Sequence, residues 1–129
     1  MPAAELHYYQ EDDEVPVYEW LSDLRDKDRK ALASCLAKIR LLAANGHELR
    51  RPHADYSRDG IYEPRTRRGR VNYRILYFFH GKNVALLAHA LTKEKAVPVA
   101  DIERAIRRKQ RYEQNPDQHR AEIEVAEDF

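Results

Sequence analysis

The chain has 129 residues, of which 43% are hydrophobic and 35% are charged, a composition typical of one globular domain rather than of a disordered segment. No apolar run approaches the roughly 20 residues of a membrane span, and residues 1–16 lack the basic and apolar regions of a signal peptide, so we expect a cytoplasmic protein. Cys35 is the sole cysteine, which excludes an internal disulfide and a cysteine-based metal site.

The net charge of +1 conceals a strong asymmetry along the chain. Residues 50–95 carry eleven Lys and Arg against four Asp and Glu, whereas residues 1–49 carry six against ten and residues 96–129 carry six against eight. A basic middle between acidic flanks is typical of a local anion-binding face. A solvated basic surface has the same charge balance, so charge alone leaves both interpretations open.

The first part of the chain predicts a short strand and a helical hairpin. Residues 6–9 are aromatic and apolar, as in an N-terminal strand, and Pro16 suits the first turn of a helix over residues 16–25. A second helix follows from an apolar stripe at helical spacing, and Asn45-Gly46 supplies its stop. The stripe consists of Leu32, Cys35, Leu36, Ile39 and Leu42.

The second part predicts three strands and a last helix. Residues 47–60 resemble a loop that ends in a turn, and the strands that follow cover residues 61–67, 70–80 and 83–92. Val97-Pro98 begins a helix that turns Ile102, Ala105 and Ile106 inward, with Arg104, Arg107, Arg108 and Lys109 outward.

The polar, acidic residues from 114 onward predict a flexible tail. We therefore expect one domain over residues 1–113 and a tail over residues 114–129. The order β-α-α-β-β-β-α predicts an α+β domain, in which an antiparallel sheet carries its helices on one face.

Two tight turns predict the register of the three strands. A turn at Gly81-Lys82 places Arg74 opposite His89, and a turn at Arg68-Gly69 places Glu63 opposite Arg74. The alternation of side chains then assigns one face to the helices. That face carries Tyr62, Val71, Tyr73, Ile75, Tyr77, Phe79, Val84, Leu86, Ala88 and Ala90.

The other face, expected to be free of helices, gathers the basic residues. It carries Glu63, Arg65, Arg67, Arg70, Asn72, Arg74, His89 and Lys93, with Leu76, Phe78, Leu87 and Leu91 toward its far end. Crowded cations repel one another, and a bound polyanion such as RNA would relieve that repulsion. Two plainer interpretations stay open: Arg74 with Glu63 as an ordinary cross-strand ion pair, and His89 as a sheet histidine with its hydrogen bonds satisfied. The histidines show no metal-ligand spacing, so we expect no metal site.

Several motifs carry a family resemblance. They are Glu63-Pro64-Arg65, the run YRILYFF at residues 73–79, the run LLAHALTKEK at residues 86–95, and Pro98 with the helix that follows. In their order and spacing, over about residues 5–112, the chain resembles the RelE/ParE toxin superfamily and most of all its HigB-type, phage-derived branch. The family's usual Glu-Leu-Arg reads Glu-Pro-Arg here, and its double lysine is split by Glu94.

The resemblance implies a toxin of a type II toxin–antitoxin pair. Such toxins are endoribonucleases that need no metal or other cofactor and cut mRNA, commonly on the ribosome. A small antitoxin, often a helix-turn-helix DNA-binding protein, neutralises them. We expect no membrane partner.

Within this implied activity, the residues receive hypothetical roles. Arg65 and Arg74 would bind the reacting phosphate, preorganised by Glu63 and Asn72. His89, Lys93 or Lys95 would transfer protons, because histidine titrates near neutral pH and crowded cations lower the pKa of a lysine. Further RNA contacts are assigned to Arg67, Arg70, Asn72 and Lys95.

Two other functions stay open. A ParE-like relative would inhibit DNA gyrase without nuclease activity, but such a protein has no need of a clustered Arg, His and Lys face. A catalytically inactive RNA-binding relative is the other alternative, and the Glu-Pro-Arg departure keeps it under consideration.

Overall fold

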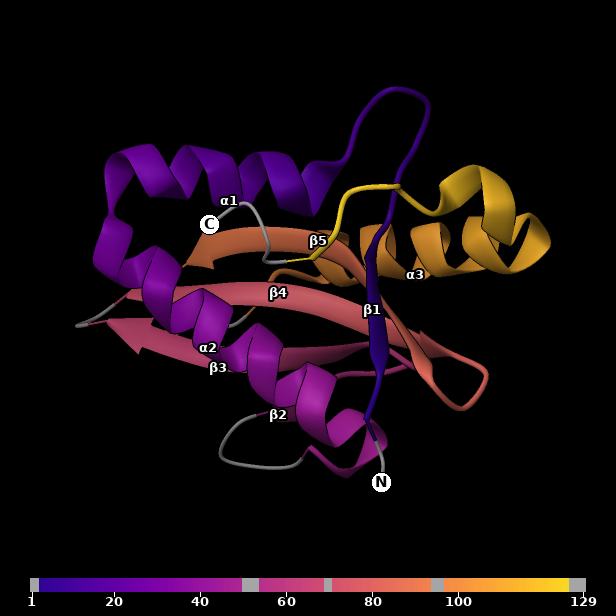
Figure 1. The fold of residues 1–129 in the computed structure, drawn as a ribbon, viewed down its shortest axis with the longest axis horizontal. Coiled ribbons are helices and arrows are strands. Elements are labelled where there is room, and N and C mark those ends of the chain that lie inside the picture. The colour runs from indigo at the N-terminus through magenta and orange to yellow at the C-terminus, as the bar shows by residue number, and fades with distance from the viewer. Residues whose placement is uncertain (1–2, 50–53, 69–70, 94–96, 126–129) are drawn as a thin grey trace.

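A computed structural model describes residues 3–49, 54–68, 71–93 and 97–125, without the side chains of residues 64, 65, 67, 68 and 93. The described residues form a five-stranded sheet with helices packed on it, which confirms the predicted α+β class (Figure 1). The elements are β1 (Glu5–Tyr8), α1 (Pro16–Lys27), α2 (Arg29–Asn45), η1 (Gly46–Glu48), β2 (Ala54–Tyr56), β3 (Tyr62–Arg68), β4 (Val71–His80), β5 (Val84–Lys93), α3 (Val99–Gln114) and η2 (Pro116–His119).

Local signals define the helical hairpin. Pro16 stands in the first turn of α1, and the side chain of Asp28 caps α2 by accepting the N–H of Ala31 at 3.1 Å. Gly46 ends α2 with a φ of 53°, a left-handed conformation that favours glycine. The predicted stripe of α2 is buried throughout, so this hairpin is confirmed.

The sheet is mixed rather than antiparallel. Its strand order is β1-β5-β4-β3-β2, with β1 parallel to β5 and the other pairs antiparallel. A parallel pair needs a long connection, and the helical hairpin between β1 and the later strands provides one. The short strand β2 lies inside the segment that the sequence predicts as a loop, and it forms the second edge of the sheet.

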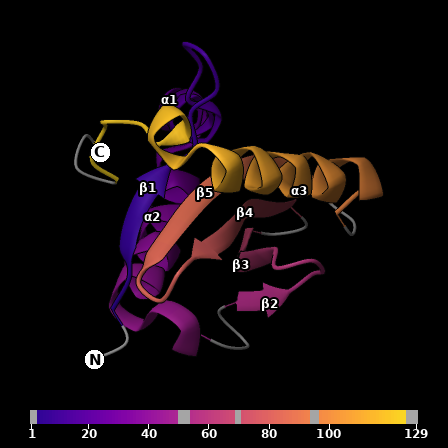
Figure 2. The same ribbon diagram turned by 90° about the vertical axis from the view of Figure 1, so that its right-hand side faces the viewer.

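Helices cover both faces of the sheet, which corrects the expectation of a single covered face. Ile75 and Tyr77 of β4 belong to the core under α1 and α2, whereas Leu76 and Phe78 pack with Tyr112 of α3. Figure 2 shows α3 on the side of the sheet away from α2. The second face is apolar over β4 and β5, and an exposed patch of that kind would be costly in water, so α3 covers it.

The register of β4 and β5 differs from the predicted one. The turn has three residues, 81–83, so that His80 pairs with Val84, and a bulge at Ala88 then shifts the register again. Val84, Leu86 and Ala88 consequently lie on the α3 face, and Leu87 lies under α1 and α2, the reverse of the prediction. Beyond the bulge, the residues of β5 from His89 onward lie on the faces of the sheet that were predicted for them.

The segment after α3 packs against the body of the protein. Ala121 donates its N–H to the carbonyl oxygen of Tyr8 at 3.0 Å and is buried, and Ile123 and Val125 contact the core under α1 and α2. With β1 and α2, residues 117 and 120–125 line a pocket of about 850 Å³. This packing of residues 115–125 differs from the flexible tail that composition predicts, and it lies beside β1 rather than over the arginine-rich strands.

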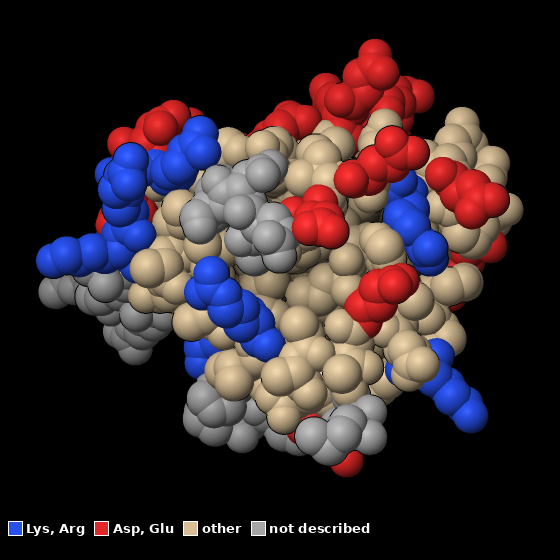
Figure 3. All heavy atoms as spheres, in the orientation of Figure 1, with Lys and Arg blue, Asp and Glu red and all other residues tan. Residues whose placement is uncertain are grey.

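Charge is spread unevenly over the face seen in Figure 3, which is the side of α1 and α2. Acidic side chains gather over the turn between β1 and α1, where Asp12, Asp13 and Glu14 are exposed. Lysines and arginines are scattered over this face. Within the described part of the chain, no helix has the length and apolar character to cross a membrane.

Candidate functional site

An ion pair between neighbouring strands forms the centre of the candidate site. Nη1 of Arg74 on β4 lies 2.8 Å from Oε2 of Glu63 on β3, and each side chain is only 12% exposed. Nε of Arg74 is buried and finds no hydrogen-bond partner among the described residues. The guanidinium is therefore held in one position instead of moving freely in solvent.

Asp55 adds a second carboxylate beside this pair. It lies on β2 directly opposite Glu63, so that the two side chains share one face of the sheet, and both residues are 9% exposed. Sequence reasoning missed Asp55, because a strand of three residues has too little alternation to stand out from a loop. The available sequence signal for this strand was the pattern of Ala54–Tyr56, in which apolar residues stand on both sides of one acidic residue.

The backbone register brings several basic positions to the same face as Arg74. Arg65 lies opposite Arg74, and Arg67 lies opposite Asn72, which in turn lies opposite Lys93. The predicted register between β3 and β4 was displaced by two residues, so the faces are as expected, but Arg65 replaces Glu63 as the direct partner of Arg74.

Two of the predicted RNA-binding residues, Arg70 and Lys95, lie outside the described residues. The side chains of Arg65, Arg67 and Lys93 are also outside the description, so for these three the structure gives only strand positions. The position of Asn72 is as expected, on the face of Arg74.

His89 lies on this face, but not opposite Arg74. Its strand partner is Leu76, while Arg74 faces Leu91, because the three-residue turn and the bulge in β5 each shift the register by one residue. Nε2 of His89 is 2.7 Å from Oδ1 of Asp101 in the first turn of α3, and Nδ1 is 3.3 Å from Nη1 of Arg108. Both ring nitrogens are therefore engaged, which agrees with the plainer interpretation of a satisfied histidine.

Burial lowers the pKa of His89. Asp101 opposes this shift through its hydrogen bond and its charge, whereas the positive charges of Arg108 and Arg104 add to it. The imidazole is consequently neutral at pH 7. In that state Nδ1 accepts from Arg108, and Nε2 carries the proton and donates it to Asp101, an assignment that follows from the two partners.

A comparison with protein families places this geometry in context. Residues 19–110 match the family model described as phage derived protein Gp49-like (DUF891), and this range is more than two thirds of the chain. The chain belongs to the Gp49-like family. The matched range includes Glu63, Arg74 and His89, so the candidate site lies within the Gp49-like region. A search of curated proteins gave no match.

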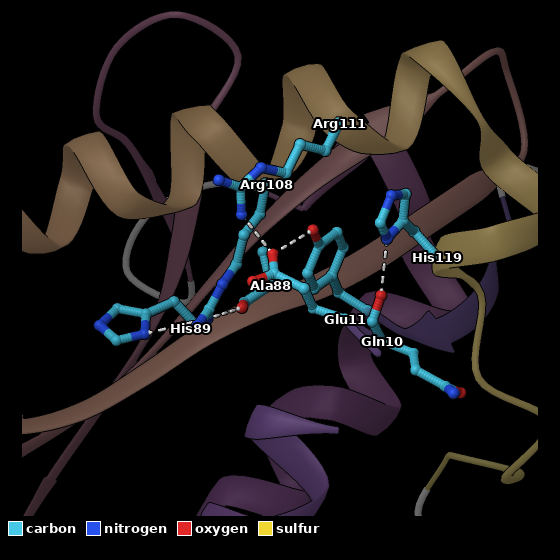
Figure 4. Close-up of polar contacts among 8 residues, drawn as sticks. Gln10, Glu11, Ala88, His89, Arg108, Arg111 and His119 are labelled. Atoms are coloured by element: carbon cyan, nitrogen blue, oxygen red, sulfur yellow. Dashed lines mark hydrogen bonds and ion pairs between the residues drawn. The ribbon is translucent and has the colours of Figure 1, made fainter. Parts of the chain in front are cut away.

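Arg108 of the Gp49-like region joins α3 to the bulge in β5, rather than pointing outward as predicted. Its Nη1 donates to the carbonyl oxygen of Ala88 at 2.6 Å, and its guanidinium lies 5.7 Å from the centre of the Tyr9 ring (Figure 4). Burial lowers the pKa of Arg108, and the negative charge of Glu11 counters this shift. Ala88 is the bulge residue that has no Cα partner in the register of β4 and β5, and Arg108 gives its carbonyl oxygen a hydrogen bond from α3.

A polar cluster next to Arg108 connects the Gp49-like region to the start of the chain. Glu11 accepts hydrogen bonds from the hydroxyl of Tyr9, at 2.9 Å, and from Arg111, and the ring of His119 stacks on Tyr9 (Figure 4). Burial, together with the Glu11 hydrogen bond, raises the pKa of Tyr9 to about 12. The hydroxyl therefore keeps its proton at neutral pH and donates a hydrogen bond to Glu11. Because Glu11 also accepts from Arg111 of α3, this cluster connects α3 to the residues at the end of β1.

Within the described residues, no group of three or more His, Cys, Asp and Glu side chains could hold a metal ion. The metal-free and cofactor-free activity that the resemblance implies is still a prediction.

Proposed function

We propose that this Gp49-like chain is the toxin of a type II toxin–antitoxin pair, a metal-independent endoribonuclease that cleaves mRNA on the translating ribosome. The proposal combines the family assignment with the HigB-type motifs at residues 73–79 and 86–95. The observation that carries it is the fixed guanidinium of Arg74, held by Glu63 and facing the strand position of Arg65.

This arrangement suits the stabilisation of a phosphate transition state. Cleavage of RNA through its 2′-hydroxyl places extra negative charge on the phosphorus oxygens, and preorganised cations stabilise that charge more than they stabilise the substrate. Glu63 holds Arg74 in place before substrate arrives, so the guanidinium would not need to reorganise. Arg65, on the opposite strand position, would be the second phosphate ligand, and Arg67 and Asn72 would contact the flanking backbone.

Proton transfer is the second requirement. His89 is neutral at pH 7, as a general base must be, but both of its nitrogens are engaged by Asp101 and Arg108. Its participation would require one of these contacts to open when RNA binds. Lys93 and Lys95 are the other candidates, because the surrounding arginines would lower the pKa of a lysine.

The expected partner is a small antitoxin with a helix-turn-helix DNA-binding domain, as the resemblance implies. It would neutralise the toxin by covering the Arg74 face or by docking on the outer helices.

The test expresses the chain from a tightly repressed promoter and maps mRNA 5′ ends in the arrested cells. The wild type is compared with Arg74→Ala and with Arg107→Ala, which removes an exposed arginine of α3 and serves as the charge-matched control. We expect growth arrest and new 5′ ends inside translated codons, retained in Arg107→Ala and reduced about 100- to 1,000-fold in Arg74→Ala.

Because Arg74→Ala leaves Glu63 unpaired, a folded variant completes the test. Arg74→Lys keeps the positive charge but loses the planar, two-pronged contact to phosphate, and it should lower cleavage while the protein stays folded. Arrest with intact mRNA would indicate a gyrase inhibitor instead. The absence of arrest would indicate an inactive RNA-binding relative.

A further inference from the structure

The free edge of β2 carries an aromatic pocket that the proposed catalytic chemistry does not use. Its volume is about 280 Å³, and it lies between the end of α2 and the pair β2–β3. The lining residues are His47, Leu49, Ala54, Asp55, Tyr56 and Tyr62. A pocket of this size holds one planar ring system rather than a drug-sized ligand.

We infer that this pocket binds a nucleobase of the RNA strand. Tyr56 is 58% exposed, and its ring meets Tyr62 edge-on with ring centres 5.0 Å apart. Tyr62 stacks on Tyr77, whose ring is buried in the core. The aromatic layer thus continues from the core to the surface and ends at an open ring face.

The exposed ring is held in position rather than free to rotate away. The hydroxyl of Tyr56 accepts the N–H of Gly60 at 3.1 Å, in the turn that joins β2 to β3. On the other side of the pocket, His47 stacks on Phe79 with ring centres 3.6 Å apart. A base that enters the pocket therefore meets rings that are already placed, which reduces the entropy lost on binding.

Charge favours a base in this pocket over a phosphate. Among the described residues that line it there is no Lys or Arg, so a phosphate would meet no cation there, and the side chain of Asp55 lies on the opposite face of the sheet, with Glu63. The attraction for the backbone lies farther along β3. Arg65 follows Tyr62 by three residues, or roughly 10 Å of strand, and its position lies on the opposite face of the sheet, the face of Arg74.

One strand of RNA could therefore occupy both places. Its reacting phosphate would lie at the position of Arg65 and Arg74, and a base of a neighbouring nucleotide would pass over the edge of the sheet into the pocket. Stacking of this kind tolerates all four bases, because every base has an aromatic face. This inference rests on the proposed function, since it assigns a second contact to the same RNA.

The experiment measures the affinity of a fluorescein-labelled 2′-O-methyl oligonucleotide of mixed sequence, which cannot be cleaved through its blocked 2′-oxygens. An abasic oligonucleotide of the same length is the second probe. The variants are Tyr56→Ala, which removes the ring, and Tyr56→Phe, which removes only the hydroxyl. Val99→Ala is the control, because Val99 is 63% exposed at the start of α3, away from the pocket.

We expect Tyr56→Ala to weaken binding of the mixed-sequence probe roughly 5- to 100-fold, and Val99→Ala to stay within about twofold of the wild type. Tyr56→Phe keeps the stacking ring but loses the hydroxyl that holds it, so its loss of affinity should be smaller than that of Tyr56→Ala. The abasic probe should bind the wild type and Tyr56→Ala equally, because it offers no base to stack.

Equal affinity of the wild type and Tyr56→Ala for the mixed-sequence probe would overturn the inference. So would an equal loss with the abasic probe, which would mean that the substitution disturbs the backbone contacts. A loss of antitoxin binding with unchanged RNA affinity would overturn it too, and would assign the pocket to a protein contact. Mapping of mRNA 5′ ends does not depend on Tyr56 binding, so the nuclease proposal can stand when the pocket proposal fails.

Discussion

Glu63 and Arg74 form an almost buried ion pair beside the carboxylate of Asp55. A buried pair gains little net stability over apolar residues, because both charges lose their hydration. The removal of one partner is costly, because the other charge is then left buried and uncompensated. At Glu63 this cost is increased by Asp55, which places a second negative charge on the same face.

We therefore predict that Arg74→Met lowers the free energy of unfolding by about 3 kcal/mol. Adding Glu63→Gln to that variant should recover more than half of the lost stability, because it removes the negative charge of Glu63 that Arg74→Met leaves unpaired. Urea denaturation of the wild type, the single variant and the double variant would measure this. Equal stability of Arg74→Met and the wild type would mean that water reaches the pair and screens it.

The double variant also separates stability from activity. It should be folded and still fail to cleave mRNA, because Arg74 is absent. Cleavage by the folded double variant would remove Arg74 from the proposed site.

His89 makes the stability of the protein depend on pH. Its pKa in the folded protein lies below the value of an unfolded chain, roughly 6.5, because burial disfavours the charged ring. Between those two pKa values the unfolded chain binds more protons, so this contribution is fully present above about pH 6.5 and is lost as the pH falls toward the folded value.

We predict that the wild type loses stability between pH 7 and pH 5 with a contribution from His89 of at most about 1.4 kcal/mol per pH unit. His89→Gln should show a smaller slope, because a glutamine amide can donate to Asp101 without titrating. Thermal or urea unfolding at a series of pH values would measure both slopes. A steeper slope in the variant would contradict the assignment of His89 as neutral in the folded state.

At the scale of the elements, the bulge in β5 and the helix α3 depend on each other. At the bulge Ala88 is left out of the register of β4 and β5, and Arg108 donates to its carbonyl oxygen from α3. The same guanidinium approaches Nδ1 of His89 and the ring of Tyr9. One side chain therefore connects α3, β5 and the end of β1 (Figure 4).

We predict that Arg108→Met lowers the free energy of unfolding by about 1–3 kcal/mol, because it removes the charged hydrogen bond to the buried Ala88 carbonyl. The matched control is Arg107→Met, at an exposed position of the same helix, which should change stability by less than about 0.5 kcal/mol. Equal effects of the two substitutions in urea denaturation would show that helix propensity, and not the Ala88 contact, is being measured.

At the scale of the whole molecule, the last described segment of the chain packs against the residues near its start. The backbone of Arg120 forms an antiparallel β-bridge with that of Tyr9, and its side chain donates to the hydroxyl of Tyr112. Ala121 is buried, and its N–H donates to the carbonyl oxygen of Tyr8. The segment thereby covers the outer side of β1, which is an edge strand of the sheet.

We predict that Ala121→Glu lowers the free energy of unfolding by about 2–4 kcal/mol, since a charged side chain cannot occupy this buried position and the apolar contacts of Ile123 and Val125 would be lost with it. Glu122→Ala, at the exposed neighbouring position, is the control and should have little effect. An Ala121→Glu variant as stable as the control would mean that the segment contributes no packing energy.

Much of the fold could be predicted from local patterns in the sequence. The helix α1 and the strands β3, β4 and β5 lie within one or two residues of their predicted bounds, α2 ends at its predicted stop, and α3 begins within two residues of its predicted start. Their periodicity, turns and caps are properties of neighbouring residues, so a single chain segment contains the information. For the same reason Glu63 and Arg74 could be predicted as neighbours, because a two-residue error in register leaves every side chain on its own face.

Only the tertiary structure decided the remaining features, because each depends on a partner far away in the sequence. The parallel pairing of β1 with β5 depends on the crossover through two helices, and the strand β2 and its Asp55 depend on β3. The faces of Val84, Leu86 and Leu87 depend on a three-residue turn and on a bulge whose carbonyl is satisfied from α3. A one-residue change of register exchanges the two faces of a strand, and the alternation of the sequence has no means of indicating which face α3 will cover.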